Sequence, residues 1–392
     1  MNKTHSVSLS IIIVSYNTKE VTRNCLSSIY QNRPQQTFEV IVVDNNSSDG
    51  SQEVIERDFP EVVLIKNSEN VGFARANNQG IRMRNGNYVL LLNPDTLVLP
   101  EAINRMIAFL NKHPKVGAIT PKIWLDEGKT LQSHILHPVT IRQFIMGFTP
   151  LGKLFPSNWV FKKMWNKDID VWRSKNPFEV DCFAGACIMV RGEVIENVGY
   201  LDENFFMFFE DTDWCLRMKK AGWRLFFVPE AEIVHLGHQS PSNRLSEMYR
   251  DSLRYYLKKH YHWLALGFLN FLFLLFKVIL KTFSYFNFGA SKKGKTIDVL
   301  TSNKLQWHEV TGAKGYILEI SIDPTFTNKG GSIVENNAYE IPPEILNRWP
   351  DGSYLWKVAP IYSNGSIGGF STPKIFKKLQ LCHESALDKN VF

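Results

Sequence analysis

Three residues, Asn93-Pro94-Asp95, interrupt an apolar run at a point where their side chains could bind a metal ion. The preceding segment Tyr88–Leu92 is apolar and aromatic, as expected of a strand that is buried on both faces. Because proline has no backbone N–H, we expect the strand to end at Pro94 and to leave Asp95 at its carboxyl end. Ligands of open α/β sheets bind outside such ends, so this carboxylate could hold a divalent cation against a phosphate. A simple turn is an equal alternative, since the same residues are frequent in turns.

A cluster of acidic residues later in the chain is the second candidate for chemistry. The segment Glu210–Asp213 reads EDTD and lies directly between Phe209 and Trp214. Crowded carboxylates beside aromatic side chains are expected to have shifted pKa values, which is the condition for a general base. The alternative is an acidic helix N-terminus that merely complements the helix dipole. Considered alone, the cluster favours that alternative.

Three further polar positions could contact a ligand. Asp44 follows a predicted strand and could accept a hydrogen bond from a pyrimidine imide or a ribose hydroxyl, or form a turn. In the segment Asn70–Asn77, Gly72 would let the backbone approach a ligand, and a helix N-terminus with Arg75 would favour an anion such as a diphosphate. His235 could bind a metal, although imidazole suits zinc better than Mg²⁺ or Mn²⁺ and a lone histidine is usually structural.

Several common reaction classes have no support in the sequence. The loop Asn70–Asn77 lacks the G-x-G-x-x-G dinucleotide fingerprint and the G-x-x-x-x-G-K-[ST] phosphate-loop pattern, so neither dinucleotide binding nor phosphate-loop chemistry is indicated there. The chain lacks a G-x-S-x-G elbow and a Ser-His-Asp pattern, so hydrolase chemistry is not indicated.

The elements that must position these residues alternate between strands and helices. We expect strands over 9–14, 38–43, 62–66 and 88–92, and helices after Asn17, around Val54, over 72–84 and over 101–111. Asn17 with Glu20 resembles a capping box for the first helix. This alternation predicts an α/β fold with a mainly parallel sheet. Further along, we expect irregular structure over 121–180, a returning strand over 181–191 in which the small residues Ala184-Gly185-Ala186 permit a close approach, and helices over 193–198 and 214–221.

Bulk properties indicate a multidomain protein with a basic segment. The chain has 392 residues, 44% hydrophobic content and five cysteines, an odd number that favours reduced thiols in a cytoplasmic protein. The short apolar run at 9–14 is followed at once by polar residues, so no secretory signal is expected. Residues 244–295 hold ten Lys/Arg and two acids, which gives +8 and leaves about −1 of the total +7 for the rest. This excess flanks an apolar stretch, so it favours an anionic membrane surface over nucleic acid.

The apolar stretch and the residues beyond it suggest two further parts. Residues 263–276 are apolar apart from Asn270, and Lys277 and Lys281 follow. This is a borderline membrane span, and an interfacial helix pair fits better than a crossing or a buried core helix. Residues 297–377 show short alternating segments that are separated by turns, which predicts a small β-sandwich. We therefore expect domains over 1–245, 246–290 and 291–380.

Taken in order, the motifs resemble a known family. The matching segments are SIIIVSYN (10–17), EVIVVDNNSSDGS (39–51), ENVGFARANNQGI (69–81), YVLLLNPDTLV (88–98), the long run 183–225 and VHLGHQS (234–240). They resemble the family 2 glycosyltransferases, in particular their rhamnosyltransferase-like branch. Residues 303–372 resemble, less specifically, a fibronectin type III module.

The resemblance implies a GT-A fold and inverting transfer from a nucleotide sugar, with Mg²⁺ or Mn²⁺ as cofactor. It implies that Asp211 is the catalytic base, with Glu210 beside it, and that Asp95 and His235 are metal ligands. Asn93 stands where many members of the family have Asp. The residues implied at the nucleotide sugar are Ser15, Asn17, Asp44, Asn46, Asn70, Gly72, Arg75, Asn77 and Asn93.

The expected function is transfer of a rhamnose-like or other hexose from a dTDP- or UDP-sugar to a glycan or polyprenyl-linked glycan. We expect this reaction at the cytoplasmic face of the cell membrane, with the protein bound peripherally or monotopically and without nucleic acid as a partner. The alternative is a catalytically silent GT-A scaffold that binds glycan or protein. The intact acidic cluster argues against that alternative.

Overall fold

The computed structural model describes residues 7–133, 138, 171–237, 245–261, 267, 298–299, 303–321, 329–349 and 352–378. The chain divides into two compact units, Met1–Ser291 and Lys292–Phe392, and each is described by itself. Most of the expected irregular region at 121–180 and nearly all of the apolar stretch at 263–288 lie outside the described residues.

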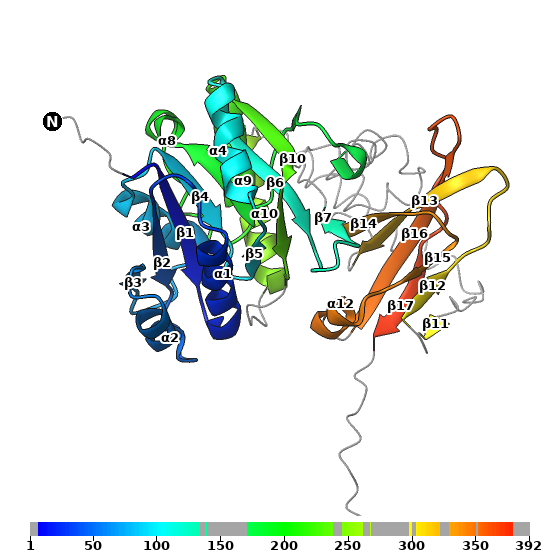
Figure 1. Ribbon diagram of the computed structural model, residues 1–392, viewed down its shortest axis with the longest axis horizontal. Coiled ribbons are helices and arrows are strands. Elements are labelled where there is room, and N and C mark those ends of the chain that lie inside the picture. The colour runs from blue at the N-terminus through cyan, green and yellow to red at the C-terminus, as the bar shows by residue number, and fades with distance from the viewer. Residues whose placement is uncertain are drawn as a thin grey trace, which may run out of the picture. The chain divides into compact units, whose positions relative to one another are not determined.

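The first unit is built on a mixed sheet in the order β7-β6-β9-β4-β1-β2-β3 (Figure 1). Strand β1 pairs in parallel with β2 and β4, and β2 pairs in parallel with β3, whereas β9 is antiparallel to both β4 and β6. Strand β10 runs parallel to β6 and antiparallel to β5 and β8. The expected α/β class with a mainly parallel sheet is therefore confirmed. The strands are β1 (Leu9–Ser15), β2 (Phe38–Asp44), β3 (Val63–Lys66), β4 (Tyr88–Leu92), β5 (Thr96–Val98), β6 (Val116–Trp124), β7 (Gln132–Ser133), β8 (Phe178–Glu179), β9 (Cys187–Arg191) and β10 (Arg224–His235).

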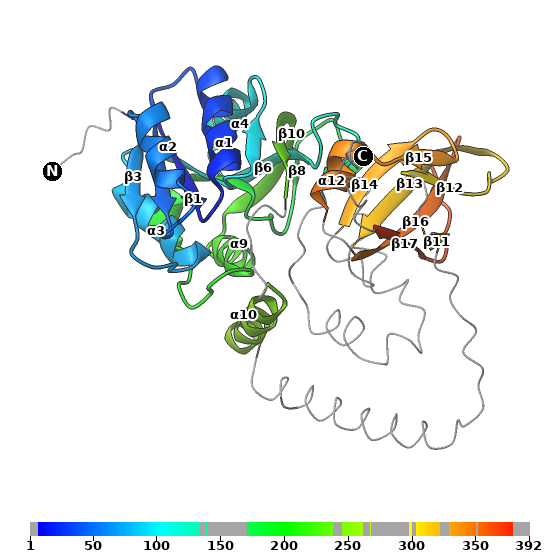
Figure 2. The ribbon, with the colours of Figure 1, turned by 90° about the horizontal axis from the view of Figure 1, so that it is seen from below.

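Helices cover both faces of this sheet (Figure 2). The larger core packs α1, α2 and α4 against one face, with fully buried Ile11, Leu26 and Leu110 among its members. On the other face, α3 places Ala76 against Val43. The helices are α1 (Lys19–Gln31), α2 (Ser51–Asp58), α3 (Phe73–Met83), α4 (Ala102–Lys112), α8 (Gly192–Val198), α9 (Glu210–Lys220) and α10 (Leu245–His260).

The predicted capping box at the first helix is wrong. Helix α1 begins at Lys19, and its N-cap Thr18 makes no side-chain capping hydrogen bond. The Asn17 side chain instead accepts a hydrogen bond from the backbone N–H of Ser48 at 2.8 Å. The Asn17 side chain therefore accepts a hydrogen bond from the loop after β2 and does not cap the first helix.

Three other boundaries differ from the prediction. The returning strand expected over 181–191 is β9, which begins only at Cys187. Helix α9 begins at Glu210 rather than Trp214, so the acidic cluster forms its first turn. Strand β6 runs through Pro121 to Trp124, where we expected irregular structure. Proline normally argues against an interior strand, but here it is opposite Val228, at an irregularity in the pairing of β6 with β10.

The second unit consists of a sheet in the order β11-β17-β16-β13-β14 and a separate pair, β12-β15. Trp307, which follows β12, contacts Tyr316 of β13 and Trp356 of β16, with ring centroids 5.4 and 6.0 Å apart. The likeness to a fibronectin type III module stays a prediction. The elements are β11 (Asp298–Val299), β12 (Lys304–Gln306), β13 (Ala313–Ser321), β14 (Lys329–Val334), β15 (Ala338–Glu340), α12 (Pro343–Arg348), β16 (Gly352–Tyr362) and β17 (Lys374–Lys378).

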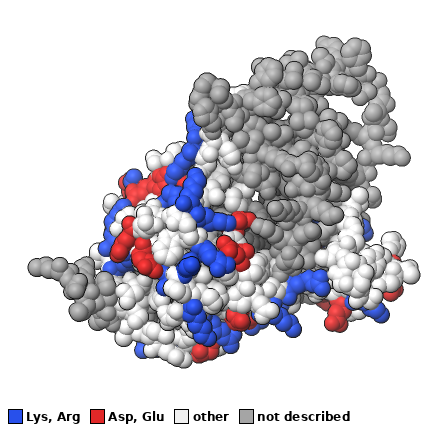
Figure 3. Space-filling view, turned by 90° about the horizontal axis from the view of Figure 1, so that it is seen from above, with Lys and Arg blue, Asp and Glu red and all other residues white. Residues whose placement is uncertain are grey.

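Two surface properties bear on the expected membrane contact. Among the residues that the structure describes, no helix has both the length and the apolar content needed to cross a membrane. On the face shown in Figure 3, basic and acidic side chains of the described residues are interspersed. Membrane association stays a prediction.

Candidate active site

The carboxyl ends of three neighbouring strands place the predicted polar residues at one edge of the sheet. Ser15 at the end of β1 pairs with Asp44 at the end of β2. In the same sheet Ile13 pairs with Leu92, the last residue of β4, so Asn93 and the residues after it emerge at the same edge. This is the edge at which open α/β sheets bind ligands.

Asn93, Asp95 and His235 form one polar cluster at this edge. The pairing of β10 with β5 sets His235 opposite Thr96. The His235 Nε2 atom lies 3.1 Å from Asp95 Oδ1 and 3.3 Å from Asn93 Nδ2. Burial of the ring opposes protonation, but the charge and the hydrogen bond of Asp95 outweigh it and raise the pKa of His235. The His235 Nε2 atom cannot donate a hydrogen bond to the Asp95 carboxylate and accept one from the Asn93 amide at the same time. Only one of these two contacts can therefore be a hydrogen bond.

The carbonyl oxygen of the Asn93 side chain, Oδ1, is buried and has no hydrogen-bond partner among the described residues. Together with the Asp95 carboxylate and the His235 imidazole, this carbonyl oxygen completes a set of O and N donors of the kind that divalent cations use. Within the described ranges, no group of three or more His, Cys, Asp and Glu side chains is positioned to hold a metal. The cluster therefore fits a metal only with the Asn93 amide as a member.

Asp211 is held in the first turn of α9 by backbone donors. Its Oδ1 accepts from the Thr212 N–H at 2.6 Å, and its Oδ2 accepts from the Gly185 N–H at 2.8 Å. Burial raises the pKa of the carboxyl group, while these hydrogen bonds oppose the rise. A Cβ atom on Gly185 would lie 3.3 Å from Asp211 Oδ2, so Asp211 is the group that closely approaches this run of small residues.

Glu210 differs from Asp211 although the two are adjacent. Its side chain is buried, and its Oε2 atom has no hydrogen-bond partner among the described residues. Burial, followed by repulsion from Asp211, raises the pKa of Glu210 well above its usual range. The environment therefore favours the neutral form of Glu210, most strongly when Asp211 is ionised.

The chain segment before β9 joins the two polar clusters. The N–H of Asn93 donates to the Ala186 carbonyl at 2.9 Å, while the preceding residue, Gly185, donates to Asp211. Consecutive Cα atoms are about 3.8 Å apart. The base candidate and the metal candidate are therefore tied to the same short piece of backbone.

Several predicted nucleotide-sugar residues also make contacts that position other groups. Asp44 is fully buried, and its Oδ2 accepts from the Ser47 N–H and the Gln52 amide, while its buried Oδ1 has no partner among the described residues. The free oxygen leaves Asp44 able to accept a hydrogen bond from a ligand. Asn46 is exposed with φ 66°, and Ser15 is buried near Thr18.

The segment Asn70–Asn77 turns into α3 at Gly72, which has φ 87°. Asn70 Oδ1 accepts from the Gly72 N–H at 3.0 Å, and Asn77 donates to the Phe73 carbonyl. The Phe73 N–H, at the start of the helix, donates to the Phe206 carbonyl at 2.7 Å. A Cβ atom on Gly72 would meet that same carbonyl oxygen at 2.7 Å. Gly72 thus permits contact with the loop before α9.

Arg75 forms an ion pair with Glu203, with its Nε 3.2 Å from a carboxylate oxygen. Its predicted contact with a diphosphate is neither shown nor contradicted by this pairing. Glu203 also accepts from Arg82 and Asn78, so three side chains of α3 hold the loop that leads to Phe206.

Sequence reasoning missed the contacts that fix α9. Asp213 has no exposed surface, and its carboxylate lies 2.8 Å from Arg217, 2.7 Å from Lys259 and 2.8 Å from His260. The spacing of Asp213 and Arg217 is a readable signal for a helical ion pair. The contacts from α10 join residues more than 40 positions apart, and no local pattern announces them.

The aromatic run before α9 packs mainly into the interior. Phe205 and Phe209 are buried against Leu253, Tyr256 and Leu257 of α10. Both Phe208 and Phe209 have positive φ, 73° and 69°, a conformation that is uncommon for bulky residues. Phe205 and Phe209 therefore pack the segment that leads into α9 against α10.

Comparisons with known proteins bear on the reaction class. Residues 10–170 match the family model described as glycosyl transferase family 2. The N-acetylglucosaminyl-diphospho-decaprenol L-rhamnosyltransferase of Mycobacterium tuberculosis is 26% identical over 271 residues, which cover 65% of this chain and 86% of that protein. The chain is a glycosyltransferase. Rhamnosyltransferase WbbL of Escherichia coli is also 26% identical to this glycosyltransferase, over 269 residues that cover 65% of the chain and 92% of WbbL.

The family 2 model matches residues 10–170 of the glycosyltransferase, and the mixed, mainly parallel sheet agrees with the expected GT-A fold. Among solved structures, the mannosyltransferase PcManGT from Pyrobaculum calidifontis, in complex with GDP-Man and Mn²⁺, aligns with a TM-score of 0.41 and 20% identity. The alignment covers 59% of this chain and 57% of that one.

Proposed function

We propose that the protein is an inverting hexosyltransferase that moves a rhamnose-like or other hexose from a dTDP- or UDP-sugar to a glycan or polyprenyl-linked acceptor. The observation that carries this proposal is the Gly185–Ala186 segment. It hydrogen-bonds Asp211 on one side and Asn93 on the other. A base and a polar cluster suited to a diphosphate-bound cation are therefore held in fixed relation.

Asn93, Asp95 and His235 would hold a Mg²⁺ or Mn²⁺ ion in this proposal. The buried, unpartnered Asn93 Oδ1 and the nearby Asp95 carboxylate supply oxygen donors, and His235 Nε2 supplies nitrogen. When bound, such an ion supplies charge neutralisation to a departing diphosphate. With a single carboxylate in the cluster, Asp95 is its main source of negative charge.

Asp211 is the proposed general base. Its raised pKa strengthens it as a proton acceptor, and the N–H groups of Gly185 and Thr212 fix its orientation. It would take the proton of an acceptor hydroxyl as that oxygen attacks the anomeric carbon of the donor from the side opposite the leaving diphosphate. Because no covalent sugar–enzyme intermediate forms, the stereocentre inverts.

The nucleotide would lie along the ends of β1 and β2. The free Oδ1 of Asp44 is suited to accept from a pyrimidine imide or a ribose hydroxyl. Ser15 and Asn17 end β1 and begin the loop that follows it, and Asn46 is exposed after β2. The mycobacterial and E. coli relatives are named as rhamnosyltransferases, which favours a rhamnose-like donor for this chain.

The remaining parts of the proposal concern location. The name of the mycobacterial relative contains a lipid-linked sugar diphosphate, and an acceptor of that kind is held at a membrane. The excess of basic residues over 244–295 would bind the anionic cytoplasmic face. The fibronectin type III-like region would hold a glycan or another protein near the reaction.

The test uses the purified full chain and a panel of nucleotide sugars, with released nucleoside diphosphate as the readout. Asp211→Asn should reduce transfer by about 10²–10⁴-fold and leave nucleotide affinity nearly unchanged, since the base is lost and the nucleotide contacts are not. Asp95→Ala should remove the stimulation by Mn²⁺, because the main anionic donor is absent.

Asp58→Asn is the matched control, since Asp58 forms an exposed ion pair at the end of α2. It should retain wild-type transfer. Full activity in Asp211→Asn, or Mn²⁺-dependent activity in Asp95→Ala, would contradict the respective assignment. Absence of transfer and hydrolysis with every donor would favour the catalytically silent scaffold.

A further inference from the structure

A chain of three side-chain amides connects the end of β2 with the turn before α3. Asn45 directly follows β2, Asn67 directly follows β3, and Gln79 lies on α3. The Asn67 Nδ2 atom donates to Asn45 Oδ1 at 2.8 Å and to Gln79 Oε1 at 2.9 Å, and Gln79 Nε2 donates to Asn67 Oδ1 at 2.9 Å. At the other end of the chain, Asn45 Nδ2 donates to the Gly72 carbonyl at 3.3 Å. Asn67 is therefore linked to Gly72 through Asn45.

This amide chain lies between two groups of residues that the proposed function places at the nucleotide. Asn45 follows Asp44 in the sequence, and the backbone N–H of Asn67 donates to the Asp44 carbonyl at 2.9 Å. Gly72 belongs to the turn in which its N–H donates to the Asn70 side chain. The Asn45 side chain is buried. The amide chain thus joins the proposed contact with the nucleoside to the proposed contact with the diphosphate.

The contact with Asn45 orients the peptide group that begins α3. The Gly72 carbonyl and the Phe73 N–H belong to one planar peptide group. The carbonyl accepts from Asn45 and from the Ala76 N–H, and the N–H donates to the Phe206 carbonyl at 2.7 Å. Gly72 has φ 87° and no side chain of its own to fix the turn. The Asn45 amide therefore ties the turn to the end of β2.

The donors and acceptors of the amide chain permit one orientation of Asn45. If its amide were reversed, Oδ1 would face the Gly72 carbonyl, and two acceptors would meet without a proton between them. The Asn45 Oδ1 atom must therefore face Asn67, which has to offer an N–H group there. A carboxylate in place of the Asn67 amide has no N–H to offer, so it would turn the Asn45 amide away from Gly72.

We propose that Asn67 is a positioning residue for the nucleotide, because it orients the Asn45 amide that holds the Gly72 turn in place beside Asp44. The proposal rests on the proposed transferase function, in which Asp44 and Gly72 lie at the nucleotide. Asn67 touches neither the nucleotide nor the reacting atoms. The four hydrogen bonds of the amide chain include neither Asp211 nor the polar cluster that follows β4. Their loss therefore weakens nucleotide affinity and leaves the turnover of bound donor unchanged.

Calorimetric titration of the full chain with UDP and with dTDP, in the presence of Mg²⁺, measures nucleotide affinity without turnover. Asn67→Asp should raise the Kd of the tighter-binding nucleotide about tenfold, the effect of one lost hydrogen bond at the Gly72 turn. Gln79→Glu is the charge control, since it adds the same charge beside Asn67 but keeps an oxygen that accepts from Asn67 Nδ2. Its Kd should rise less, and the difference between the two variants should persist at high ionic strength, which screens the added charge.

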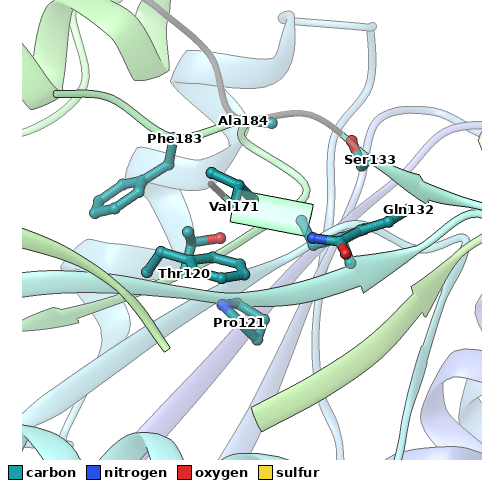
Figure 4. Close-up of a pocket in the computed structure, with 9 residues that line it drawn as sticks. Thr120, Pro121, Gln132, Ser133, Val171, Phe183 and Ala184 are labelled. Carbon is teal, nitrogen blue, oxygen red and sulfur yellow. The ribbon is translucent and has the colours of Figure 1, made fainter. Parts of the chain in front are cut away.

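Gln79→Leu is a second, uncharged variant, and it decides the question if Asn67→Asp does not fold. Gln79 is partly exposed on α3, and its loss removes the partner that holds the Asn67 amide, so the Kd should rise about 2–10-fold. The matched control is Gln132→Leu, which should keep the wild-type Kd. Gln132 lines a small pocket with Thr120 and Val171 (Figure 4), and β6, β9, β4 and β1 lie between its strand, β7, and β2.

Initial rates at saturating donor complete the test, with circular dichroism to confirm folding. In Asn67→Asp and Gln79→Leu, kcat should equal that of the wild type, and the KM for the donor should rise with the Kd. Equal affinities in Asn67→Asp and Gln79→Glu, a wild-type Kd in Gln79→Leu, or a wild type that binds neither nucleotide would overturn the positioning role. Weakened nucleotide binding in Asn67→Asp, in a protein that transfers no sugar, would support the positioning role and contradict the proposed function.

Discussion

The adjacent acids of α9 should respond very differently to the same chemical change. Glu210→Gln and Asp211→Asn each replace a carboxyl group by an amide of nearly the same shape. The structure predicts that the first substitution is tolerated and the second is not. Burial and the Asp211 charge raise the pKa of Glu210 and so favour its neutral form, which an amide would preserve.

The magnitudes follow from the partners of each side chain. Glu210→Gln removes at most one neutral hydrogen bond, about 0.5–1.5 kcal/mol, so the transfer rate should fall by no more than roughly tenfold. Asp211→Asn removes the base, which is worth about 10²–10⁴-fold. It also leaves one of the two backbone donors, Gly185 or Thr212, without an oxygen, at a further cost of about 1–3 kcal/mol in stability.

The pH profile gives an independent readout. Transfer requires ionised Asp211, so the raised pKa of this group should place the acid limb of kcat/KM above the usual aspartate range. Burial is the largest cause of that shift, and it persists in Glu210→Gln, so the limb should stay raised in this variant. The stability share has the opposite pH dependence. A carboxyl group with a raised pKa contributes to the free energy of unfolding fully below its unfolded-state pKa, and this contribution is lost as pH rises through its folded-state pKa.

The assay is initial-rate release of nucleoside diphosphate from pH 4 to pH 9, with circular dichroism to confirm folding at each pH. A loss in Glu210→Gln as large as that in Asp211→Asn would refute the assignment of a neutral acid and a charged base. An acid limb at the pH of an ordinary exposed aspartate would refute the effect of burial on Asp211.

Two stability predictions follow from contacts around this site. Gly72→Ala should lower the melting temperature more than Gly199→Ala. Both glycines have positive φ, but an added Cβ at Gly72 meets Phe206 at 2.7 Å and one at Gly199 meets nothing within 4 Å. The backbone strain that both variants share costs about 1–3 kcal/mol and the clash at Gly72 about 1–3 kcal/mol more, so equal melting temperatures would contradict this prediction. Lys259→Met should lower the free energy of unfolding by about 1–3 kcal/mol in urea titrations, because the fully buried carboxylate of Asp213 loses one of its cations. The control is Arg254→Met, also on α10, which should change the free energy of unfolding by less than about 1 kcal/mol because the ion pair of Arg254 with Asp251 is exposed.

Much of the sheet could be predicted from sequence because its strands carry strong local signals. The buried runs that became β1, β2 and β4 have ends marked by polar residues and, at Pro94, by a residue that cannot extend the ladder. Since parallel strands end at a common edge, the sequence also located Asp44 and Asp95 near each other in principle. The family match and the strand order confirm that reasoning at the level of fold and reaction class.

The parts that sequence reasoning missed depend on contacts between distant segments. Strand β6 contains Pro121, a residue type that normally argues against an interior strand. The strand continues through it at a point where the pairing of β6 with β10 is irregular. The carbonyl and ring of Phe206, more than 130 residues later, lie against Gly72, whose predicted approach to a ligand stays a prediction. Neither neighbour can be inferred from the residues next to the site in sequence.

The segment EDTD shows why residue type alone could not decide between a catalytic cluster and an ordinary helix start. Its three carboxyl groups have three different environments. Glu210 is buried without a partner for one oxygen, and burial with the charge of Asp211 raises its pKa well above the usual range. Asp211 is oriented by backbone N–H groups. Asp213 is neutralised by cations, and it is the group whose pKa the structure lowers, because hydrogen bonds and charges of His260, Lys259 and Arg217 overcome its burial. Its stabilising share is therefore present above the unfolded-state pKa and lost as pH falls through the folded-state value. The helix start and the catalytic base were posed as alternatives. The structure confirms the helix start, with Asp213 as the acid that anchors it, and the assignment of Asp211 as the base remains our proposal.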